Sequence, residues 1–315
     1  MQETTATFTS NDGVQLFIYQ WLPDQPAKAL IHIIHGMAEH AGRYARVGRI
    51  LTEHGYAVYA DDHRGHGRTA ISKEKLGHFA NENGWNRVLE DFELLIESEA
   101  AFHPELPVIL FGHSMGSFFA QQLMYKHGEK LSGCVLSGSG GKLDAQYYFM
   151  KMLAYLERLR VGRRGKAKLL HFIGLKAANK GFRPVRTHYD WLTRKADEID
   201  KVLADPLFGF TCSAQFWLDM INALSEILDP ANQARIPKNL PIYIFSGAKD
   251  PLGDNCTGLE YLIASYRRAG LTNVRYRFYP EGRHEMLNEL NQEEVVADLL
   301  SWLGEVTSTT KGALV

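Results

Sequence analysis

The residues of this sequence best suited to chemistry form the Gly-His-Ser-Met-Gly segment at residues 112–116, which follows an apolar run at residues 108–111. Gly-x-Ser-x-Gly between a strand-like run and a helical pattern is typical of a nucleophile elbow, a sharp turn that presents a serine hydroxyl at the end of a sheet. Side chains at the two glycine positions would collide with the neighbouring strand and helix. The pattern predicts that Ser114 is a nucleophile, although an ordinary glycine-rich turn would have the same pentapeptide.

A serine hydroxyl becomes a strong nucleophile only when a base takes its proton and a carboxylate orients that base. Asp250 follows a strand-like run at residues 242–245, and His284 follows another at residues 274–278. The order serine, acid, histidine is the one expected when all three lie at the ends of successive parallel strands. Alone, Asp250 could be a turn former before proline and His284 a surface residue. Their joint placement with Ser114 predicts a catalytic triad.

Attack on a carbonyl group creates an oxyanion, which two well-placed N–H donors stabilise. The residue after the nucleophile, Met115, is expected to supply one donor, and the loop after the third strand is expected to supply the other. That loop spans residues 35–40, and its His35-Gly36 pair permits a tight turn that would place Met37 for this role. Both donors are backbone groups, so the methionine side chains can line an apolar site. We expect neither a metal site nor an organic cofactor.

Eight strand-like runs alternate with helical patterns along the chain. The first two runs flank Asn11-Asp12-Gly13, a hairpin signal, and several later runs are continuously apolar, as in strands covered on both faces. The runs lie at residues 5–9, 14–21, 29–34, 57–60, 108–111, 133–136, 242–245 and 274–278, and the helical patterns lie at residues 44–54, 85–102, 115–127, 259–269 and 292–303. This order predicts an α/β fold with a mostly parallel, eight-stranded sheet flanked by helices.

One long segment interrupts the alternation. Residues 143–235 contain helical patterns without a convincing strand, and they fall between the sixth and seventh strand-like runs. We expect a helical insertion that lies over the sheet edge where Ser114 is placed and acts as a cap or lid. The core is then divided into residues 1–142 and 236–306, and the tail of small and polar residues at 307–315 is expected to be frayed.

Three motifs carry a resemblance to a known family. They read HGMAEHAGRY at residues 35–44, DHRGHGRT at residues 62–69 and GHSMG at residues 112–116. Together they resemble the monoacylglycerol lipase and lysophospholipase branch of the α/β-hydrolases, and parts of residues 191–210 resemble the cap of bacterial members. Thr69 and Ser117 stand where serine and a small residue, often glycine, are usual, and residues 143–186 match the family poorly.

The resemblance implies the α/β-hydrolase fold with an inserted helical cap, together with the same triad and the same oxyanion donors. It also implies that Glu39, Arg43 and His113 lie near the polar head-group end of the site and contact substrate. An acid at a helix start and a surface ion pair would explain Glu39 and Arg43 equally well. Substrate preference would be set in the poorly matching part of the insertion.

The composition is that of an ordinary globular protein, with 315 residues of which 45% are hydrophobic and 23% are charged. A net charge of -1 provides no argument for binding nucleic acid. The three cysteines cannot form a disulfide framework and lack metal-ligand spacing, which favours a reducing, cytoplasmic location. The first residues lack the features of a signal peptide, and no apolar run approaches the ~20 residues that span a bilayer.

Positive charge is concentrated in one part of the expected insertion. Residues 151–186 hold eleven lysines and arginines but a single acid, Glu157, and apolar residues such as Leu159 and Phe172 lie between them. A basic amphipathic element of this kind fits the surface of an anionic membrane, which would make the protein peripheral at the inner membrane surface. The alternative is a solvated, charged face on helices that cover the site.

These features predict a serine hydrolase that cleaves carboxylic esters of lipids, either monoacylglycerol or lysophospholipid, through an acyl-enzyme. Alternatives on the same scaffold are a general carboxylesterase and an aminopeptidase or amidase, in which Glu39 would bind a free amine. A non-catalytic membrane-binding protein would have no need of an intact triad. An epoxide or haloalkane hydrolase would require a carboxylate in place of Ser114.

Overall fold

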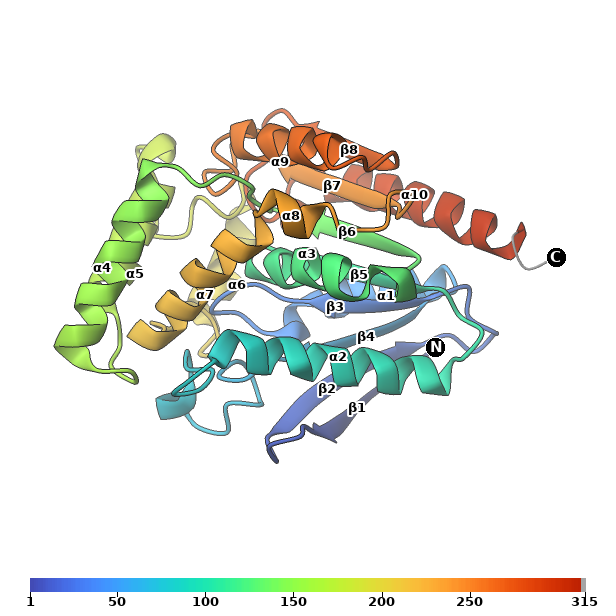
Figure 1. Cartoon of the computed structure of the whole chain (residues 1–315), viewed down its shortest axis with the longest axis horizontal. Coiled ribbons are helices and arrows are strands. Elements are labelled where there is room, and N and C mark those ends of the chain that lie inside the picture. The colour runs from blue at the N-terminus through green and yellow to red at the C-terminus, as the bar shows by residue number, and fades with distance from the viewer. Residues whose placement is uncertain (313–315) are drawn as a thin grey trace.

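The computed structural model describes residues 1–312 and contains an eight-stranded sheet with helices on both faces (Figure 1). The strands follow the order β1-β2-β4-β3-β5-β6-β7-β8; the β1–β2 and β2–β4 pairs are antiparallel and the others are parallel. Their bounds are β1 (Gln2–Thr9), β2 (Gln15–Leu22), β3 (Leu30–Ile34), β4 (Ala57–Asp62), β5 (Val108–His113), β6 (Gly133–Ser137), β7 (Ile242–Gly247) and β8 (Val274–Tyr279). The expected mostly parallel, eight-stranded sheet is confirmed.

The central strands are apolar throughout because helices cover both of their faces. Side chains alternate along a strand, so Ile109 and Phe111 of β5 belong to one core cluster and Leu110 belongs to the other. Helices α2, α3 and α9 pack on the Leu110 face, and helices α1 and α10 pack on the opposite face. Their bounds are α1 (Ala45–Glu53), α2 (Gly84–Phe102), α3 (Met115–His127), α9 (Thr257–Arg268) and α10 (Gln292–Gly312).

The segment between β6 and β7 is helical, and α4 and α5 project from one end of the sheet (Figure 1). Asp144 caps α4 by accepting the Tyr147 N–H, and Ser213 caps α7 by accepting the Phe216 N–H. The helices of this insertion are α4 (Ala145–Val161), α5 (Lys168–Ala178), α6 (Ala196–Ala204), α7 (Ala214–Ile227) and α8 (Pro230–Gln233). Short 3₁₀ helices occur at η1 (Ala41–Tyr44), η2 (Lys73–Lys75), η3 (Gly128–Lys130), η4 (Lys180–Phe182) and η5 (Met286–Asn288).

The C-terminal helix is longer than the sequence pattern indicates. Helix α10 continues to Gly312, so the expectation of a frayed tail is wrong for residues 307–312, and residues 313–315 lie outside the described part of the chain. Thr307 explains part of the continuation, because it is buried and its hydroxyl donates to the Leu303 carbonyl at 2.9 Å. Within residues 1–312, no helix combines the length and apolarity needed to cross a bilayer.

Candidate active site

Ser114 lies at the junction of β5 and α3, where the chain turns sharply. Its backbone has φ 52° and ψ -121°, a conformation that L-residues rarely adopt, and its N–H donates to the Ser137 carbonyl at 2.9 Å. A Cβ on Gly116 would lie 2.0 Å from the Ile34 carbonyl oxygen, and one on Gly112 would lie 2.6 Å from the Gly116 carbonyl oxygen. The turn has the geometry of the predicted elbow, and the close packing confirms the need for both glycines.

A buried acid–base pair lies beside the elbow. His284, in the loop after β8, forms a 2.9 Å hydrogen bond between its Nδ1 and Oδ2 of Asp250. Asp250 is completely buried and also accepts the Ser246 hydroxyl at 3.0 Å and the Leu252 N–H at 2.9 Å. A bond from Nδ1–H to the carboxylate leaves Nε2 of His284 as the proton acceptor. The pair can therefore serve as a base and its orienting acid.

Burial and charge have opposite effects on this pair. Burial alone would raise the pKa of Asp250, but the charge and the hydrogen bond of His284 hold it below its usual value. Burial alone would lower the pKa of His284, but the charge and hydrogen bond of Asp250 raise it above the usual 6.5, with the charges of Glu285 and Glu39 adding to that effect. The imidazole is consequently a stronger base than a free one, which suits the removal of a hydroxyl proton.

Two further glycines let the loops of the site approach one another. A Cβ on Gly138, after β6, would lie 2.9 Å from Cε1 of His284, and one on Gly36, after β3, would lie 3.1 Å from Cβ of Ser114. The ring of His113, the residue before the nucleophile, lies 4.8 Å from the ring of His284 between centroids. The structure thus gathers all three predicted triad residues at the carboxyl edge of the sheet, although they come from distant parts of the chain.

The two expected oxyanion donors lie in the loops next to the nucleophile. Among the described residues, neither the Met37 N–H nor the Met115 N–H donates a hydrogen bond. Their neighbours are occupied, because the Gly36 N–H donates to a carboxylate oxygen at 2.6 Å and the Ala38 N–H donates to Nε2 of His66 at 3.2 Å. The unusual backbone conformation of this turn lies at Ala38, which has a φ of 56°, and not at the His35-Gly36 pair as expected. Two N–H groups are thus available for an oxyanion.

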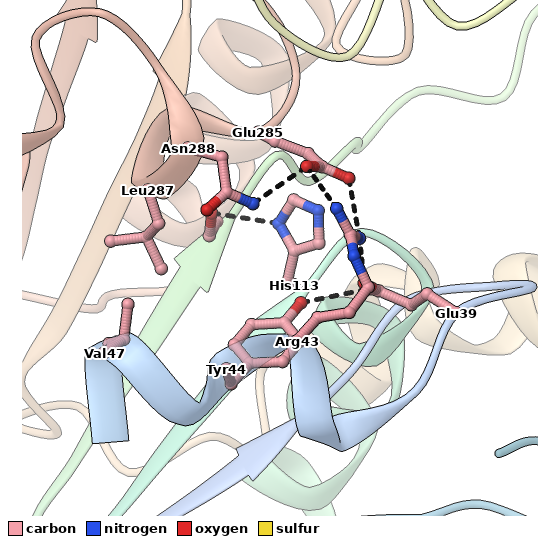
Figure 2. A pocket seen from close by; sticks show the side chains of 9 residues that line it. Glu39, Arg43, Tyr44, Val47, His113, Glu285, Leu287 and Asn288 are labelled. Carbon is pink, nitrogen blue, oxygen red and sulfur yellow. Dashed lines mark hydrogen bonds and ion pairs between the residues drawn. The ribbon is translucent and has the colours of Figure 1, made fainter. Parts of the chain in front are cut away.

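A small polar cavity adjoins the acid–base pair, and Figure 2 shows the side chains around it. Its volume of about 20 Å³ is enough for about one water molecule. All three residues expected at the head-group end of the site line this cavity. The lining consists of Glu39, Arg43, Tyr44, Val47, His113, Ser137, Glu285, Leu287 and Asn288.

Arg43 lies between two buried carboxylates in this cavity (Figure 2). It donates to Oε2 of Glu39 and forms two hydrogen bonds of 2.9 and 2.7 Å with Glu285. Burial alone would raise the pKa of Glu285, but Arg43 lowers it to about 2. The remaining oxygen of Glu39 accepts the Gly36 N–H at 2.6 Å and the Tyr44 hydroxyl at 2.9 Å. One cation faces two anions, which leaves the cluster with a formal charge of about -1.

These contacts bear on the aminopeptidase alternative. A free amine would require a carboxylate with an unoccupied oxygen, but both oxygens of Glu39 already accept hydrogen bonds. Moving Arg43 aside to admit an amine would leave buried carboxylates without a counter-charge. His113 adds no charge, because burial and the nearby His284 lower its pKa to about 4, and its Nδ1 lies 3.1 Å from the Ser137 hydroxyl. The cluster therefore offers polar groups without a ready amine site.

Two residues beside the pair were not anticipated as parts of the site. Glu285 has the contacts described above, and the only sequence signal for it is its position next to His284. Trp191 belongs to the insertion, and its ring centroid lies 4.9 Å from that of His284. No spacing along the chain connects these two rings, so their contact becomes visible only in the folded structure.

Comparison with known proteins identifies the family. The family described as "Serine aminopeptidase, S33" matches residues 25–291. The chain belongs to this family. The S33 match extends from before β3 to just beyond η5, and it therefore includes every candidate site residue.

Relatives of this S33 protein include several lipases. It is 28% identical to the monoacylglycerol lipase of Mycolicibacterium smegmatis over 94% of this chain and 95% of the relative, and 26% identical to the human monoglyceride lipase over 95% and 89%. Among solved structures, a carboxyl esterase from Bacillus coagulans aligns with a TM-score of 0.88 and 25% identity, covering 98% and 99%. The expected α/β-hydrolase fold and the monoacylglycerol lipase branch are confirmed. The comparisons support a serine hydrolase of lipid esters and favour it over the alternatives.

Proposed function

We propose that this S33 hydrolase cleaves monoacylglycerol or lysophospholipid in two steps. Nε2 of His284 takes the proton of Ser114 while the hydroxyl oxygen attacks the ester carbonyl, and the N–H groups of Met37 and Met115 hold the oxyanion. His284 then gives that proton to the leaving alcohol, and an acyl-enzyme remains. In the second step His284 deprotonates a water molecule, which attacks the acyl carbon. As the bond from the acyl carbon to the Ser114 oxygen breaks, His284 returns the proton to that oxygen, which releases the fatty acid and restores the serine.

One observation carries this proposal. The buried 2.9 Å bond between Asp250 and His284 lies next to a strained serine turn, and two unpaired N–H groups flank that turn. A structural role alone would not require a base, an orienting acid and an oxyanion site in one place. Glu39, Arg43 and His113 supply polar groups beside this machinery, and we place the leaving alcohol on their side of the site.

The test compares the wild type with Ser114→Ala on esters of increasing chain length, 1-monooleoylglycerol, lysophosphatidylcholine and proline naphthylamide. We expect Ser114→Ala to lose ester turnover by at least about 10³-fold, because the acyl-enzyme cannot form. Ser225→Ala, which changes a partly exposed serine of α7, serves as the control and should leave turnover unchanged. Persistent ester turnover by Ser114→Ala would contradict the proposal, and preferential hydrolysis of proline naphthylamide would favour the aminopeptidase.

We also propose that α4 and α5 dock on anionic membranes. The exposed apolar residues of α4 recur three or four positions apart, which places them on one face of the helix, and they are between 49% and 68% exposed. They are Tyr148, Phe149, Met152, Tyr155, Leu156 and Leu159. Helix α5 adds Leu169 and Phe172 at 44% and 60% exposure, whereas Leu170 of the same stretch is completely buried. An apolar face bordered by lysines and arginines suits an anionic lipid surface.

Vesicles of phosphatidylglycerol and phosphatidylcholine test this docking surface. The double variant Leu159→Glu/Phe172→Glu should bind vesicles at least about tenfold more weakly, because carboxylates cannot enter the acyl-chain boundary. Phe102→Glu is the matched control, since Phe102 is 78% exposed but lies at the end of α2. Unchanged vesicle binding by the double variant would refute docking through α4 and α5. Both variants should hydrolyse a short, water-soluble ester at the wild-type rate.

A further inference from the structure

The imidazole of the base contacts two aromatic rings from different parts of the chain. The centroid of the Trp191 ring is 4.9 Å from that of the imidazole, with an interplanar angle of 37°. The centroid of the His113 ring is 4.8 Å away, with an interplanar angle of 47°. His284 is only 2% exposed. The insertion therefore supplies one wall of the space in which the imidazole lies.

Backbone contacts fix the position of the Trp191 ring relative to the base. The His284 N–H donates to the Trp191 carbonyl at 3.3 Å, and the next N–H, of Glu285, donates to the Leu192 carbonyl at 2.7 Å. Farther along, the Thr193 hydroxyl donates to a backbone carbonyl of η5 at 2.9 Å. These bonds tie consecutive residues of the insertion to consecutive residues of the histidine loop. The two segments consequently behave as one unit at this point.

A buried carboxylate strengthens the same attachment. Glu289 is completely buried, and it accepts the Arg194 backbone N–H at 3.0 Å and Nε of Arg194 at 2.9 Å. It also accepts the Arg283 N–H at 3.2 Å, so it bridges the insertion and the residue before the base. Separating Arg194 from Glu289 would leave a buried carboxylate without its counter-charge, which favours a permanent contact over a movable lid at this position.

We infer that Trp191 is a positioning residue for the general base of the proposed hydrolase. The bond to Asp250 fixes Nδ1 of His284 but permits the ring to rock about that bond. The indole opposes this motion and also keeps water away from the imidazole. Nε1 of Trp191 is buried and donates to no described residue, so the indole is not held there by a hydrogen bond of its own. This inference rests on the proposed function of His284.

Loss of the indole should change the protonation of the base in a defined direction. Burial is the largest single influence on the pKa of His284 and lowers it, so admitting water by removing the indole should raise that pKa while the bond to Asp250 persists. The charged groups around the imidazole remain in place: Asp250 after β7, Glu285 in its own loop, and Glu39 with Arg43 after β3. His113 stays neutral, because its pKa is lowered to about 4. The acid limb of the kcat/KM profile, where activity falls because the base becomes protonated, should therefore move to higher pH.

The activity test uses Trp191→Leu, the conservative Trp191→Phe, and Trp217→Phe as a control. Trp217 is a second insertion tryptophan whose Nε1 is buried and unpaired among the described residues. We expect Trp191→Leu to lower kcat for a p-nitrophenyl ester by about 10- to 100-fold and to shift the acid limb upward. Trp191→Phe should restore most of kcat, and Trp217→Phe should keep the wild-type limb. An unshifted limb in Trp191→Leu, with or without a loss of kcat, would overturn the inference.

A fluorescence titration tests the ring contact without any turnover. The contribution of Trp191 to the fluorescence is the difference in emission between the protein with Trp191 and its Trp191→Phe variant. A protonated imidazole beside an indole quenches the emission of the indole. The contribution of Trp191 should therefore fall as the pH decreases through the pKa of His284. The titration is performed in a Ser114→Ala background, which separates it from the proposed hydrolysis. The pH dependence of the Trp191 emission should disappear when His284→Asn is added. Emission from Trp191 that does not respond to pH, or that responds equally in His284→Asn, would overturn the inference even if ester hydrolysis is confirmed.

Discussion

At the scale of single residues, charge compensation inside the protein controls what the site can do. The His284 imidazole is buried, which disfavours its protonated form, yet the adjacent Asp250 carboxylate more than offsets that effect. Arg43 has the converse role, since its positive charge lowers the pKa of Glu285, which burial alone would raise. Both arrangements place ionised groups out of water only where an opposite charge lies within hydrogen-bond distance.

The first prediction concerns Asp250→Asn. Loss of the carboxylate should lower kcat for ester hydrolysis by about 10⁴-fold, because the imidazole loses both its tautomer and its orientation. It should also lower the pKa of His284, since Asp250 is what raises that pKa. The acid limb of the kcat/KM profile, where activity falls because the base is protonated, should therefore move to lower pH than in the wild type. Asp254→Asn, at an exposed position in the same loop, is the control, and a limb that does not move would contradict this assignment.

A second prediction concerns the stability contributed by Arg43. Arg43→Met should reduce the free energy of unfolding by about 3–5 kcal/mol at neutral pH, because two buried carboxylates lose their counter-charge. The loss should shrink as the pH falls from about 4.5, the ordinary value for Glu285, towards its pKa of about 2 in the folded protein, because a protonated carboxyl group no longer needs the guanidinium. Arg49→Met is the matched control, because its ion pair with Glu3 is exposed and should contribute at most about 1 kcal/mol. Urea denaturation at several pH values makes the measurement, and equal losses for the two variants would refute the role of Arg43.

At the scale of elements, the packing of β3, β5 and α3 builds the elbow. The strand end, the turn and the helix start approach so closely that no side chain fits between them at position 116. The insertion is attached to the same region at a second place, because the Gly209 N–H donates to the Ala38 carbonyl at 2.8 Å and His40 pairs with Asp205 at 2.8 Å. The insertion thus contacts both the loop at residues 35–40 and the loop that carries His284, while α4 and α5 extend beyond these loops (Figure 1).

The third prediction tests the close approach at the elbow. Gly116→Ala should lower the free energy of unfolding by about 3 kcal/mol and abolish ester turnover, since its Cβ would lie 2.0 Å from a backbone oxygen of β3. Gly304→Ala in α10 is the control, because a Cβ there meets nothing within 4 Å and should stabilise the helix by about 0.5–1 kcal/mol. Thermal unfolding of both variants makes the comparison. An active, stable Gly116→Ala protein would show that the strand and the helix can separate at little cost.

At the scale of the whole molecule, charge is distributed unevenly on a chain whose net charge is only -1. Three bases of residues 151–186 form ion pairs, with Glu157, Glu82 and Asp200 as their partners. The stretch nevertheless keeps a large positive excess, because it contains eleven bases and one acid. The resulting field lies at the end of the molecule that also exposes the apolar face of α4 (Figure 1).

The fourth prediction follows from that asymmetry. Binding to phosphatidylglycerol vesicles should weaken markedly as salt rises from ~0.05 to ~0.5 M, because the Debye length falls well below the spacing of the charges. Binding to vesicles of phosphatidylcholine alone should be weaker and nearly independent of salt. Sedimentation of the protein with vesicles measures both. Salt-independent binding to the anionic vesicles would exclude electrostatic docking and leave only the apolar contribution of α4 and α5.

The local sequence was sufficient for the strands, the elbow and the placement of Ser114, Asp250 and His284 at strand ends. Periodicity depends on neighbouring residues, so the eight strand-like runs correspond to β1–β8 with boundaries that differ by a few residues. Gly112 and Gly116 could be explained from the sequence because a turn of this type leaves no room for a Cβ. The placement of Asp250 and His284 at strand ends follows from the parallel sheet, whose carboxyl ends share one edge.

The folded chain was required for contacts that join distant segments. The Trp191 contact with His284, the bridging role of Glu289 and the pairing of Arg43 with Glu285 all connect residues that no spacing relates. The continuation of α10 to Gly312 likewise begins with the burial of Thr307, which a polar tail sequence does not reveal. Short-range steric and periodic preferences act along the chain and can be predicted from it. Burial and charge pairing depend on which segments meet, and this is established only when the insertion packs against the sheet.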